Sequence, residues 1–370
     1  MKAAVMQAAG APLIVVDDIE IEAPRAGQVR VRVTHCGLCH SDLSIADGVF
    51  PTPTPIILGH EAAGIVDAIG PEVTGLAVGD HVVLTPIPPC GVCYWCVRGE
   101  PGVCANAGML QTNTLPDGRT GLSRRGEVVF RGVGLGAFAE YVVSPVSGAV
   151  KIAPEVSLEV ACVIGCAVQT GVGAVLNTAK VEEGATVLVM GLGGIGLSIV
   201  QGARLAGAAR ILVTDPVAAR REAALRLGAT DAIDPGSTDV ATRTLELTGV
   251  GADYAFDAVG RAALVQTGVA ATRAGGTTVC VGAAPMDDVI QVAPAALFTL
   301  TEKKLIGCAL GSCNSVREIP RLLALWQAGR LDLEALITRR RPLAEIGQAM
   351  DDLRAARGIR TVLCCHEGAC

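Results

Sequence analysis

Four cysteines lie within fifteen residues of this chain, in the spacing C-x2-C-x2-C-x7-C. They are Cys90, Cys93, Cys96 and Cys104. Gaps this short allow one loop to present four thiolates to a tetrahedral Zn²⁺. A disulfide knot is the alternative, but residues 1–16 lack the pattern of a secretory signal, and disulfides are rare in reducing compartments. The spacing therefore predicts a structural zinc lobe over residues 88–106. The lack of a signal-like pattern predicts a cytoplasmic location.

Length and composition favour a globular protein of about two domains. The chain has 370 residues, of which 51% are hydrophobic but only 3% aromatic. Its most apolar window, Val160–Leu176, is interrupted by Gln169 and Thr170, so we expect no membrane span. The net charge is −6 and no basic stripe is present, which disfavours nucleic acid and anionic membrane surfaces as partners.

The hydrophobic period changes along the chain. From Val29 to Val33 apolar residues alternate with arginines, and short apolar runs recur between Gly and Pro at Ala62–Ile69, His81–Leu84 and Ala139–Val143. This texture predicts a β-rich first half. After Pro154 a long apolar period predicts a helix over Leu158–Thr178.

Short β-branched runs then alternate with helical patterns, which predicts a parallel sheet covered on both faces. The predicted strands of this part are Thr186–Met190, Ile211–Thr214, Tyr254–Asp257, Thr277–Val281 and Lys304–Leu310. The last stretch, Val316–Arg360, is mainly helical in pattern, and Thr361–Cys364 is a predicted strand.

A glycine-rich fingerprint marks this second half. Gly191, Gly193, Gly194, Ile195 and Gly196 belong to a G-x-G-x-x-G run that follows a predicted strand and opens a helical pattern. Such glycines permit a tight turn and close approach of the backbone to a pyrophosphate at a helix N-terminus. The next strand ends at Asp215, whose carboxylate would accept hydrogen bonds from an adenosine ribose and repel a 2′-phosphate. The pattern predicts NAD rather than NADP; an ordinary strand–turn–helix without a cofactor is the alternative.

Three further ligand-type residues are far apart in sequence. Cys39, His60 and Cys166 each lie in a Gly-flanked segment. Two thiolates and one imidazole with an open fourth position are typical of a catalytic zinc site. Singly, each residue is ambiguous, because a lone buried Cys is more often a small core residue than a ligand.

Taken together, these motifs resemble the zinc-dependent alcohol dehydrogenases of the medium-chain dehydrogenase/reductase superfamily. The similarity runs over the whole chain and is greatest to the longer branch that includes the liver-type and glutathione-dependent enzymes. The motifs that carry it are Gly37–Asp42, Gly59–Glu61, the four-cysteine lobe, Gly165-Cys166, Gly191–Gly196 and Ile359–Thr361. The resemblance implies an α/β fold with a GroES-like β-rich catalytic domain, residues 1–167 and 312–370, and a Rossmann doubly wound parallel-sheet NAD-binding domain, residues 168–311. It places the active cleft between them.

The resemblance also implies the activity and the roles of the catalytic residues. The chain would interconvert primary alcohols and aldehydes by hydride transfer with NAD, using one catalytic and one structural Zn²⁺. Ser41 would take the alcohol proton; the alternative is an N-cap role for a helix beginning at Asp42, and the two roles are compatible. Asp42 would orient His60, and Glu61 would approach the metal during ligand exchange.

By the same resemblance, further residues face the cofactor or the substrate. The implied cofactor residues beyond the fingerprint and Asp215 are His40, Thr170, Arg220 and Arg360. The implied substrate pocket contains Phe50, Pro86, Met109, Val133, Ala283 and Ala309. Several of these are smaller than the usual Phe, Leu, Val and Ile, which predicts a roomy pocket for aromatic or medium-to-long alcohols. Loop insertions around residues 111–136 could fill that space from another side.

Three departures from the family pattern carry information. His40 replaces an arginine against the pyrophosphate, so we expect faster NADH release. Ser44 replaces a histidine, so the proton relay is expected to end at Ser44 or in solvent. Gly108 replaces an arginine used for a thiol adduct, which counts against a glutathione- or mycothiol-type formaldehyde dehydrogenase, the alternative within enzymes.

Oligomerisation and the remaining cysteines complete the expectations. Lys304–Leu310 resembles the edge strand through which family members pair, which predicts a homodimer, with a tetramer left open. A non-catalytic regulator that binds NAD and zinc is the alternative outside enzymes. We expect a frayed terminus over Cys364–Cys370. Inert packing roles are expected for Cys36, Cys162, Cys280, Cys308 and Cys313.

Overall fold

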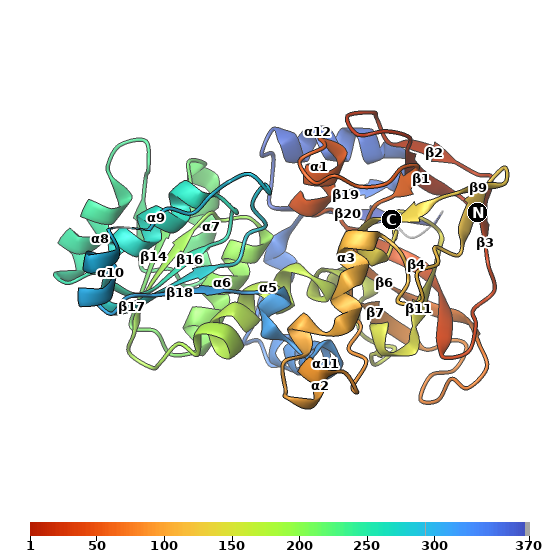
Figure 1. Ribbon diagram of the computed structural model, residues 1–370, viewed down its shortest axis with the longest axis horizontal. Helices are drawn as coiled ribbons and strands as arrows, with labels where there is room; N and C mark the ends of the chain where they lie inside the picture. The colour runs from red at the N-terminus through yellow and green to blue at the C-terminus, as the bar shows by residue number, and fades with distance from the viewer. Residues whose placement is uncertain (293, 367–370) are drawn as a thin grey trace. The chain divides into compact units, whose positions relative to one another are not determined.

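The computed structural model describes residues 1–292 and 294–366 and divides into two compact units (Figure 1). The first unit consists of residues 1–167 together with the chain from Cys313 onward, and the second of Val168–Ser312. Within the described residues, no single helix is long and apolar enough to span a membrane; one bent pair, 158–165 with 167–179, reaches the required length and composition only when both parts are counted together.

Three β-sheets build the first unit. A seven-stranded sheet has the order β12-β7-β6-β4-β20-β19, with β11 also paired to β4; a four-stranded sheet has the order β10-β5-β1-β2; and a three-stranded sheet has the order β3-β8-β9. The strands are β1 Ala3–Met6, β2 Ile14–Val16, β3 Ile19–Ile21, β4 Gln28–Gly37, β5 Ile56–Ile57, β6 Glu61–Ile69, β7 His81–Leu84, β8 Leu122–Arg124, β9 Glu127–Val128, β10 Phe130–Arg131, β11 Tyr141–Pro145, β12 Ala149–Lys151, β19 Ile337–Pro342 and β20 Arg360–Cys364. Its helices are α1 His40–Ala46, α2 Tyr94–Val97, α3 Met109–Thr112, α4 Leu158–Cys162, α11 Ser315–Gln327 and α12 Ile346–Arg354.

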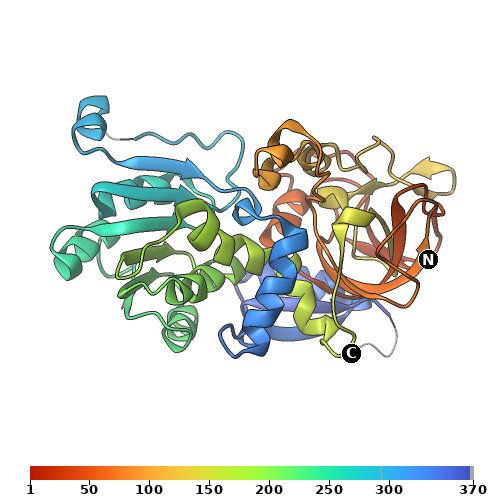
Figure 2. The same cartoon turned by 90° about the horizontal axis from the view of Figure 1, so that it is seen from below.

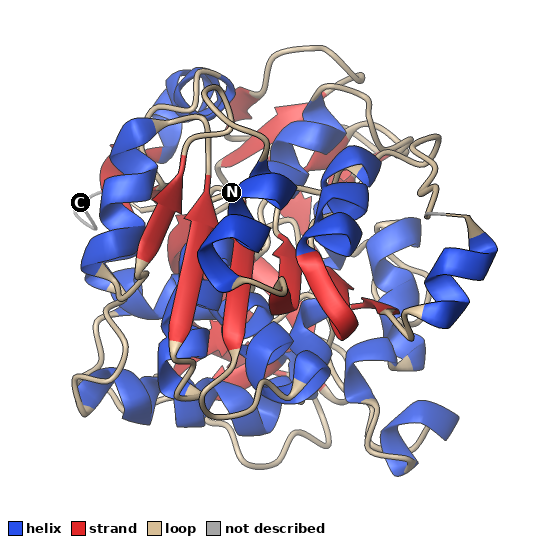
Figure 3. Ribbon diagram, turned by 90° about the vertical axis from the view of Figure 1, so that its left-hand side faces the viewer, coloured by secondary structure: helices blue, strands red, loops and turns tan. Residues whose placement is uncertain are grey.

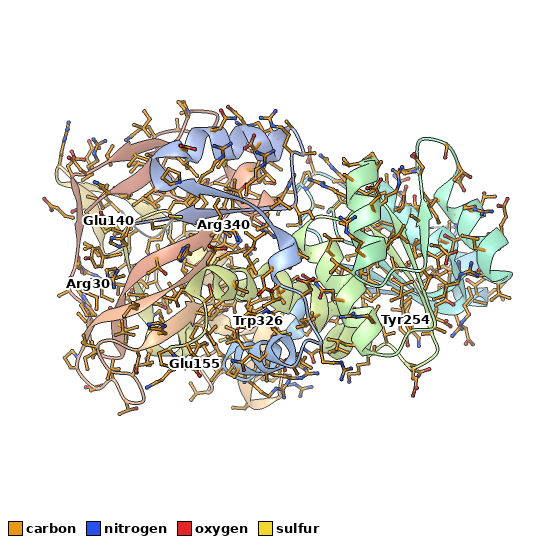
Figure 4. All side chains as sticks on the ribbon, turned by 180° about the vertical axis from the view of Figure 1, so that it is seen from behind. Arg30, Glu140, Glu155, Tyr254, Trp326 and Arg340 are labelled. Atoms are coloured by element: carbon orange, nitrogen blue, oxygen red, sulfur yellow. The ribbon has the colours of Figure 1, made fainter. Side chains whose placement is uncertain are left out.

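The longest strand, β4, shows why the alternating pattern forms a sheet. Val29, Val31 and Val33 are fully buried, while the intervening arginines are partly exposed. Arg30 reaches Asp67 of β6 at 2.6 Å and lies over the ring of Tyr141 of β11 (Figure 4). One face of the strand therefore enters the core and the other is stabilised by polar contacts to its neighbours.

The C-terminal segment completes this sheet. β20 pairs antiparallel with β4, so that Leu363 faces Cys36 in the register. Beyond the strand, Cys365 is buried and its N–H donates to Thr34 O at 2.9 Å, while the ring of His366 packs edge-on against Tyr141. The expectation of a frayed tail is therefore wrong for residues 364–366, because the chain continues to make sheet and core contacts there; residues 367–370 lie outside the described part.

The second unit is a six-stranded parallel sheet of order β15-β14-β13-β16-β17-β18, flanked by helices (Figure 3). Its strands are β13 Thr186–Met190, β14 Arg210–Thr214, β15 Asp231–Ile233, β16 Ala252–Asp257, which carries Tyr254 (Figure 4), β17 Thr272–Cys280 and β18 Lys304–Gly307. Its helices are α5 Ala167–Gly173, α6 Gly194–Leu205, α7 Ala218–Arg226, α8 Val240–Thr248, α9 Ala262–Ala271 and α10 Ala295–Leu300. The central strand β13 is nearly continuous in apolar residues because helices cover both of its faces.

Several predicted elements differ from the structure. The stretch Val316–Arg360, expected to be mainly helical, contains β19, and the strand expected over Thr277–Val281 begins earlier, at Thr272. The helix expected over Leu158–Thr178 is interrupted at Cys166, whose φ of −136° and ψ of −76° are not helical. Gly165 there presses on the β7 backbone, since a Cβ would lie 2.4 Å from Leu84 O. The strand expected over Lys304–Leu310 ends at Gly307 instead, and residues 310–312 form a turn with positive φ angles.

Candidate active site

One buried cluster of metal-ligand side chains lies in the first unit. Cys39, His60, Glu61 and Cys166 each offer one ligand atom, and these atoms all lie within 4.8 Å of one another. All four residues are at most 8% exposed. The structure therefore brings together three residues that are 21 and 106 positions apart in the sequence, with a carboxylate beside them.

Sheet register assembles this cluster. Gly37 at the end of β4 pairs with Glu61 at the start of β6, which places Cys39 and His60 just beyond adjoining ends of these neighbouring strands. Gly37 leaves no room for a side chain, because a Cβ there would be 2.4 Å from Glu61 Oε2. The break in the helix at Cys166 adds the third ligand from the segment beside β7.

Asp42 holds two of the ligand segments in place. Its fully buried carboxylate accepts hydrogen bonds from Cys39 N at 3.0 Å and from Gly59 N at 2.9 Å, and lies 3.2 Å from His60 Nδ1. Contact at Nδ1 leaves Nε2 of the imidazole as the nitrogen available to a metal. Cys39 is also the N-cap of α1, which begins at His40. The alternative role of Ser41 as an N-cap is therefore wrong, because Asp42 reaches back to Cys39 instead.

The electrostatics of the cluster fit a bound divalent cation. A hydrogen bond from Cys166 lowers the pKa of Cys39 well below its usual value, against the effect of burial and with help from His60. The pKa of Cys166 is raised well above its usual value by this same contact and by burial. Burial lowers the pKa of His60, but the charges of Asp42 and Cys39 outweigh it and raise that pKa overall. The two cysteines thus have opposite pKa shifts, because two thiolates side by side in a buried site repel each other. A Zn²⁺ ion would offset that repulsion and allow both cysteines to be thiolates.

Glu61 has spare acceptor capacity beside these ligands. Its Oε1 accepts from Ala167 N at 3.2 Å, whereas the buried Oε2 has no hydrogen-bond partner among the described residues. Burial raises the pKa of Glu61 to about 7, partly offset by Arg360, whose guanidinium lies 3.4 Å away. An unpaired buried acceptor is costly unless a cation or proton is near, so this oxygen also fits a metal site.

Arg360 is placed at this cluster by its position in β20. It is 5% exposed and donates to Leu38 O at 2.6 Å in addition to its contact with Glu61. Arg360 was expected to face the cofactor, and its contact with Glu61 was not predicted. The sequence signal that marked Arg360 as functional was its place in the family-like motif Ile359–Thr361.

Ser41 and His40 occupy the first turn of α1. The hydroxyl of Ser41 lies 3.8 Å from Cys39 Sγ, so it is beside the ligand cluster, as a proton acceptor for a bound alcohol would need to be. His40 is exposed on the same turn, whereas Ser44 lies one turn further along α1.

The four-cysteine lobe forms a second ligand cluster in the first unit. The ligand atoms of Cys90, Cys93, Cys96 and Cys104 again lie within 4.8 Å of one another. Backbone N–H groups donate to their sulfurs, including Cys90 N to Cys104 Sγ and Cys93 N to Cys90 Sγ, both at 3.3 Å. Backbone hydrogen bonds lower the pKa of Cys93 to about 6, while burial raises that of Cys104 to about 12. N–H donors around sulfur stabilise thiolates, as four-thiolate coordination requires.

Little else stabilises this lobe. Its only regular α-helix, α2, has four residues, and Val92, Tyr94 and Val97 are 82%, 66% and 70% exposed. A segment with so few buried apolar side chains would gain much of its stability from a metal bound by the four cysteines.

The fingerprint of the second unit forms the turn that was predicted. β13 ends at Met190, and α6 begins at Gly194 with Gly193 as its N-cap. Gly196 is required by close packing, because a Cβ there would be 1.8 Å from Gly191 O. The backbone of Gly191–Gly196 thus makes the tight strand–turn–helix that a pyrophosphate needs.

Asp215, directly after β14, is hydrogen-bonded to this turn. Its carboxylate accepts from Leu192 N and Val217 N, each at 2.8 Å, and Arg220 of α7 lies 3.9 Å away. The residue is buried and adjacent to the fingerprint, in the position that a ribose-binding carboxylate occupies in such folds. Thr170 lies in the same unit, buried on α5.

The predicted pocket residues are divided between the units. Phe50 and Val133 pack against the main core of the first unit, where Pro86 and Met109 are buried. Ala283 and Ala309 are exposed on the second unit. Their common pocket therefore remains a prediction. Gly108, at the end of a short turn before α3, has no neighbour within 4 Å of a Cβ position.

Comparisons with known proteins agree with this geometry. Residues 25–154 match the model described as alcohol dehydrogenase GroES-like domain, and residues 194–327 match that described as zinc-binding dehydrogenase. The chain is 37% identical to an S-(hydroxymethyl)glutathione dehydrogenase from Synechocystis over 98% of this chain and 99% of the relative. It is 38% identical to an NDMA-dependent alcohol dehydrogenase from Amycolatopsis methanolica, over 98% of each chain.

Solved structures show the same similarity. A benzyl alcohol dehydrogenase from Acinetobacter calcoaceticus superimposes with a TM-score of 0.93 at 32% identity, covering 99% of both chains. An alcohol dehydrogenase zinc-binding domain protein from Burkholderia ambifaria gives a TM-score of 0.92 at 37% identity, covering 98% of both. With its GroES-like and parallel-sheet units and its ligand clusters, the chain belongs to the zinc-dependent alcohol dehydrogenases of the medium-chain dehydrogenase/reductase superfamily.

Proposed function

We propose that the protein is an NAD-dependent enzyme that holds one catalytic and one structural zinc and interconverts primary alcohols and aldehydes. The observation that carries this proposal is the buried cluster of Cys39, His60 and Cys166, with Asp42 against the imidazole. Three protein ligands with an open position are typical of catalytic zinc, whereas four thiolates are typical of structural zinc.

Different residues of the chain would have separate roles in hydride transfer. Zinc, when bound, supplies a Lewis acid that favours the deprotonated form of an alcohol. Ser41, beside Cys39, is positioned to accept the alcohol proton, and Ser44 or solvent would receive it next. Asp42 fixes the imidazole of His60, and the spare oxygen of Glu61 is available when ligands exchange. The fingerprint and Asp215 would bind and orient NAD, the hydride acceptor.

A screen of alcohols and aldehydes by NADH absorbance tests this proposal. NADH formation that depends on a primary alcohol, and NADH consumption with the corresponding aldehyde, are expected. The absence of turnover in zinc-loaded protein across the whole panel would favour a regulator that binds NAD and zinc without catalysis.

We expect longer and aromatic alcohols to be better substrates than ethanol. Each additional buried methylene contributes roughly 0.8 kcal/mol, so two or three should raise kcat/KM by about ten- to fiftyfold, mainly through KM. The small residues Ala283 and Ala309 support this expectation, and Ala309→Ile should reduce the preference. Steady-state kinetics with ethanol, hexanol and benzyl alcohol measure it, and an equal or higher kcat/KM for ethanol would contradict it.

A thiol-adduct formaldehyde dehydrogenase is the second candidate. The 37% identity to an S-(hydroxymethyl)glutathione dehydrogenase favours it, whereas Gly108 in place of a basic residue opposes it. Turnover of S-(hydroxymethyl)glutathione with a kcat/KM well above that of every simple alcohol would support this candidate over the first.

We further propose that the protein is a homodimer paired through β18. This strand is the edge of the six-stranded sheet, and no strand pairs with its outer side within the described residues. The segment that precedes it projects from the rest of the unit (Figure 2) and exposes Met286, Leu297 and Leu300 by 84%, 55% and 80%. Such an edge with apolar surroundings is typical of a pairing surface. Sedimentation should give a dimer at working concentration; a monomer would contradict the proposal.

A further inference from the structure

Val133 has a strained backbone within the first unit. Its φ is 54° and its ψ 32°, a left-handed conformation that is rare for a β-branched residue. Strain of this kind persists only where surrounding contacts impose it, and it is concentrated at functional sites. Val133 belongs to the turn Gly132–Gly134, inside the segment 111–136 where loop insertions were expected.

Asn113 makes a side-chain hydrogen bond to the strained residue. Its side chain is fully buried, and its Oδ1 accepts a hydrogen bond from Val133 N at 3.1 Å. Its backbone carbonyl accepts from Arg131 N at 3.0 Å, and its own N–H donates to Met109 O at 2.9 Å. Asn113 itself has a φ of 55°, which Asn tolerates better than most residues. One residue thus ties the end of α3 to the turn that carries Val133.

The two tied segments pack directly on each other. Gly134 lies so close to Met109 that a Cβ there would be 2.8 Å from Met109 Cβ. Met109 is 3% exposed, and Val133 packs against the main core of the unit. Their relative position is therefore fixed, which an apolar wall requires if it is to discriminate between ligands of different size.

The turn Gly132–Gly134 also contacts the segment between β5 and β6 that contains His60. A Cβ at Gly132 would be 2.7 Å from Leu58 Cδ2, and Ala137 N donates to Gly59 O at 2.8 Å. Leu58 and Gly59 immediately precede His60 in the sequence. The turn held by Asn113 is thus anchored on the segment that leads into the metal-ligand cluster.

We propose that Asn113 is a positioning residue for substrate selectivity: by holding Val133 in its strained conformation against Met109, it fixes one wall of the alcohol pocket and so sets the preference for longer alcohols. The inference rests on the proposed function. It concerns Asn113 and does not depend on which alcohol is physiological.

The test compares four single variants and one double variant in the zinc-loaded full-length protein with ethanol and hexanol. Asn113→Gly permits the left-handed backbone but removes the Oδ1 acceptor. Asn113→Asp retains that acceptor and loses only the Nδ2 donor to Gln111 O. Gln111→Ala is the matched control, because this exposed side chain belongs to the same segment and its backbone carbonyl, the partner of Asn113 Nδ2, is unchanged. Val133→Gly removes the wall side chain and relieves the strain, so it should fold even if Asn113→Gly does not.

Asn113→Gly is expected to lower the hexanol-to-ethanol ratio of kcat/KM by about fourfold, the equivalent of one buried methylene, through the KM for hexanol. Asn113→Asp should restore most of the ratio, and Gln111→Ala should leave it unchanged. Val133→Gly alone should lower the ratio, and adding Asn113→Gly to it should have little further effect, because the two residues act through one contact.

An unchanged hexanol-to-ethanol ratio of kcat/KM in Asn113→Gly would overturn this inference, as would an unchanged ratio in Val133→Gly if Asn113→Gly does not fold. The proposed function would still stand in that case, provided that the wild type turns over alcohols. Independent effects of the two substitutions would overturn it as well. Absence of alcohol turnover in the wild type would instead mean that the proposed function itself is wrong, and the inference with it.

Discussion

Replacing Cys166 by serine is expected to abolish alcohol-dependent NADH formation, by more than about a hundredfold, while leaving most of the stability of the protein intact. Cys166 contributes one of the two cysteine sulfurs of the buried cluster with Cys39 and His60. That cluster is supported by sheet register and by the hydrogen bonds of Asp42, so the fold around it does not depend on the metal alone. Steady-state turnover, zinc content and the free energy of unfolding are the measurements. Cys39→Ser should behave in the same way.

Cys96→Ser is the contrasting substitution. The lobe of Cys90, Cys93, Cys96 and Cys104 has little apolar core, so its zinc is expected to contribute several kcal/mol of folding free energy, given about 10 kcal/mol or more in small zinc domains. Loss of stability should therefore be the main effect. Cys162→Ser is a matched control, since Cys162 is buried close to Cys166 in sequence but is in neither ligand cluster. Equal losses of stability from Cys166→Ser and Cys96→Ser would argue against separate roles for the two sites.

Asp215→Ser is expected to change the cofactor preference from NAD toward NADP. Serine removes a charged acceptor for the ribose, and hydrogen bonds to charged groups are worth about 1.5–3 kcal/mol, so kcat/KM for NAD should fall by about ten- to a hundredfold. The substitution also removes a negative charge that repels a 2′-phosphate. Arg220, 3.9 Å from Asp215, would then be available to form an ion pair with that phosphate. Kinetics with both cofactors at saturating alcohol provide the measurement.

Because Asp215 also accepts from Leu192 N and Val217 N, a control must separate loss of these bonds from loss of recognition. Asp234→Ser in the same unit removes a carboxylate that bonds Arg221 and a backbone N–H, and it should leave the preference unchanged. A wild-type enzyme that already prefers NADP would show that the assignment of Asp215 is wrong.

Local patterns predicted much of the fold. β7 and β13 have the bounds expected from their apolar runs, and the turn from Met190 into α6 was expected from its glycines. The four-cysteine lobe is predictable for the same reason: its ligands are neighbours in sequence, so spacing alone limits what they can form.

Features that depend on tertiary contacts were less predictable. Cys39, His60 and Cys166 meet through strand register, and no spacing rule connects them; only similarity to a family grouped them in advance. The break at Cys166 and the ordered contacts of Cys365 follow from packing against β7 and β4, which apolar periodicity does not encode. The tie between Asn113 and Val133 depends on two left-handed residues with no common sequence signal.

Zinc content measured together with alcohol-dependent NADH formation on the same purified preparation tests the central claim most directly. The two ligand clusters predict two zinc ions per chain, with turnover of benzyl alcohol or hexanol proportional to occupancy of the site formed by Cys39, His60 and Cys166. Two zinc ions per chain without NADH formation from any alcohol would contradict the proposal that this chain is an alcohol dehydrogenase using NAD.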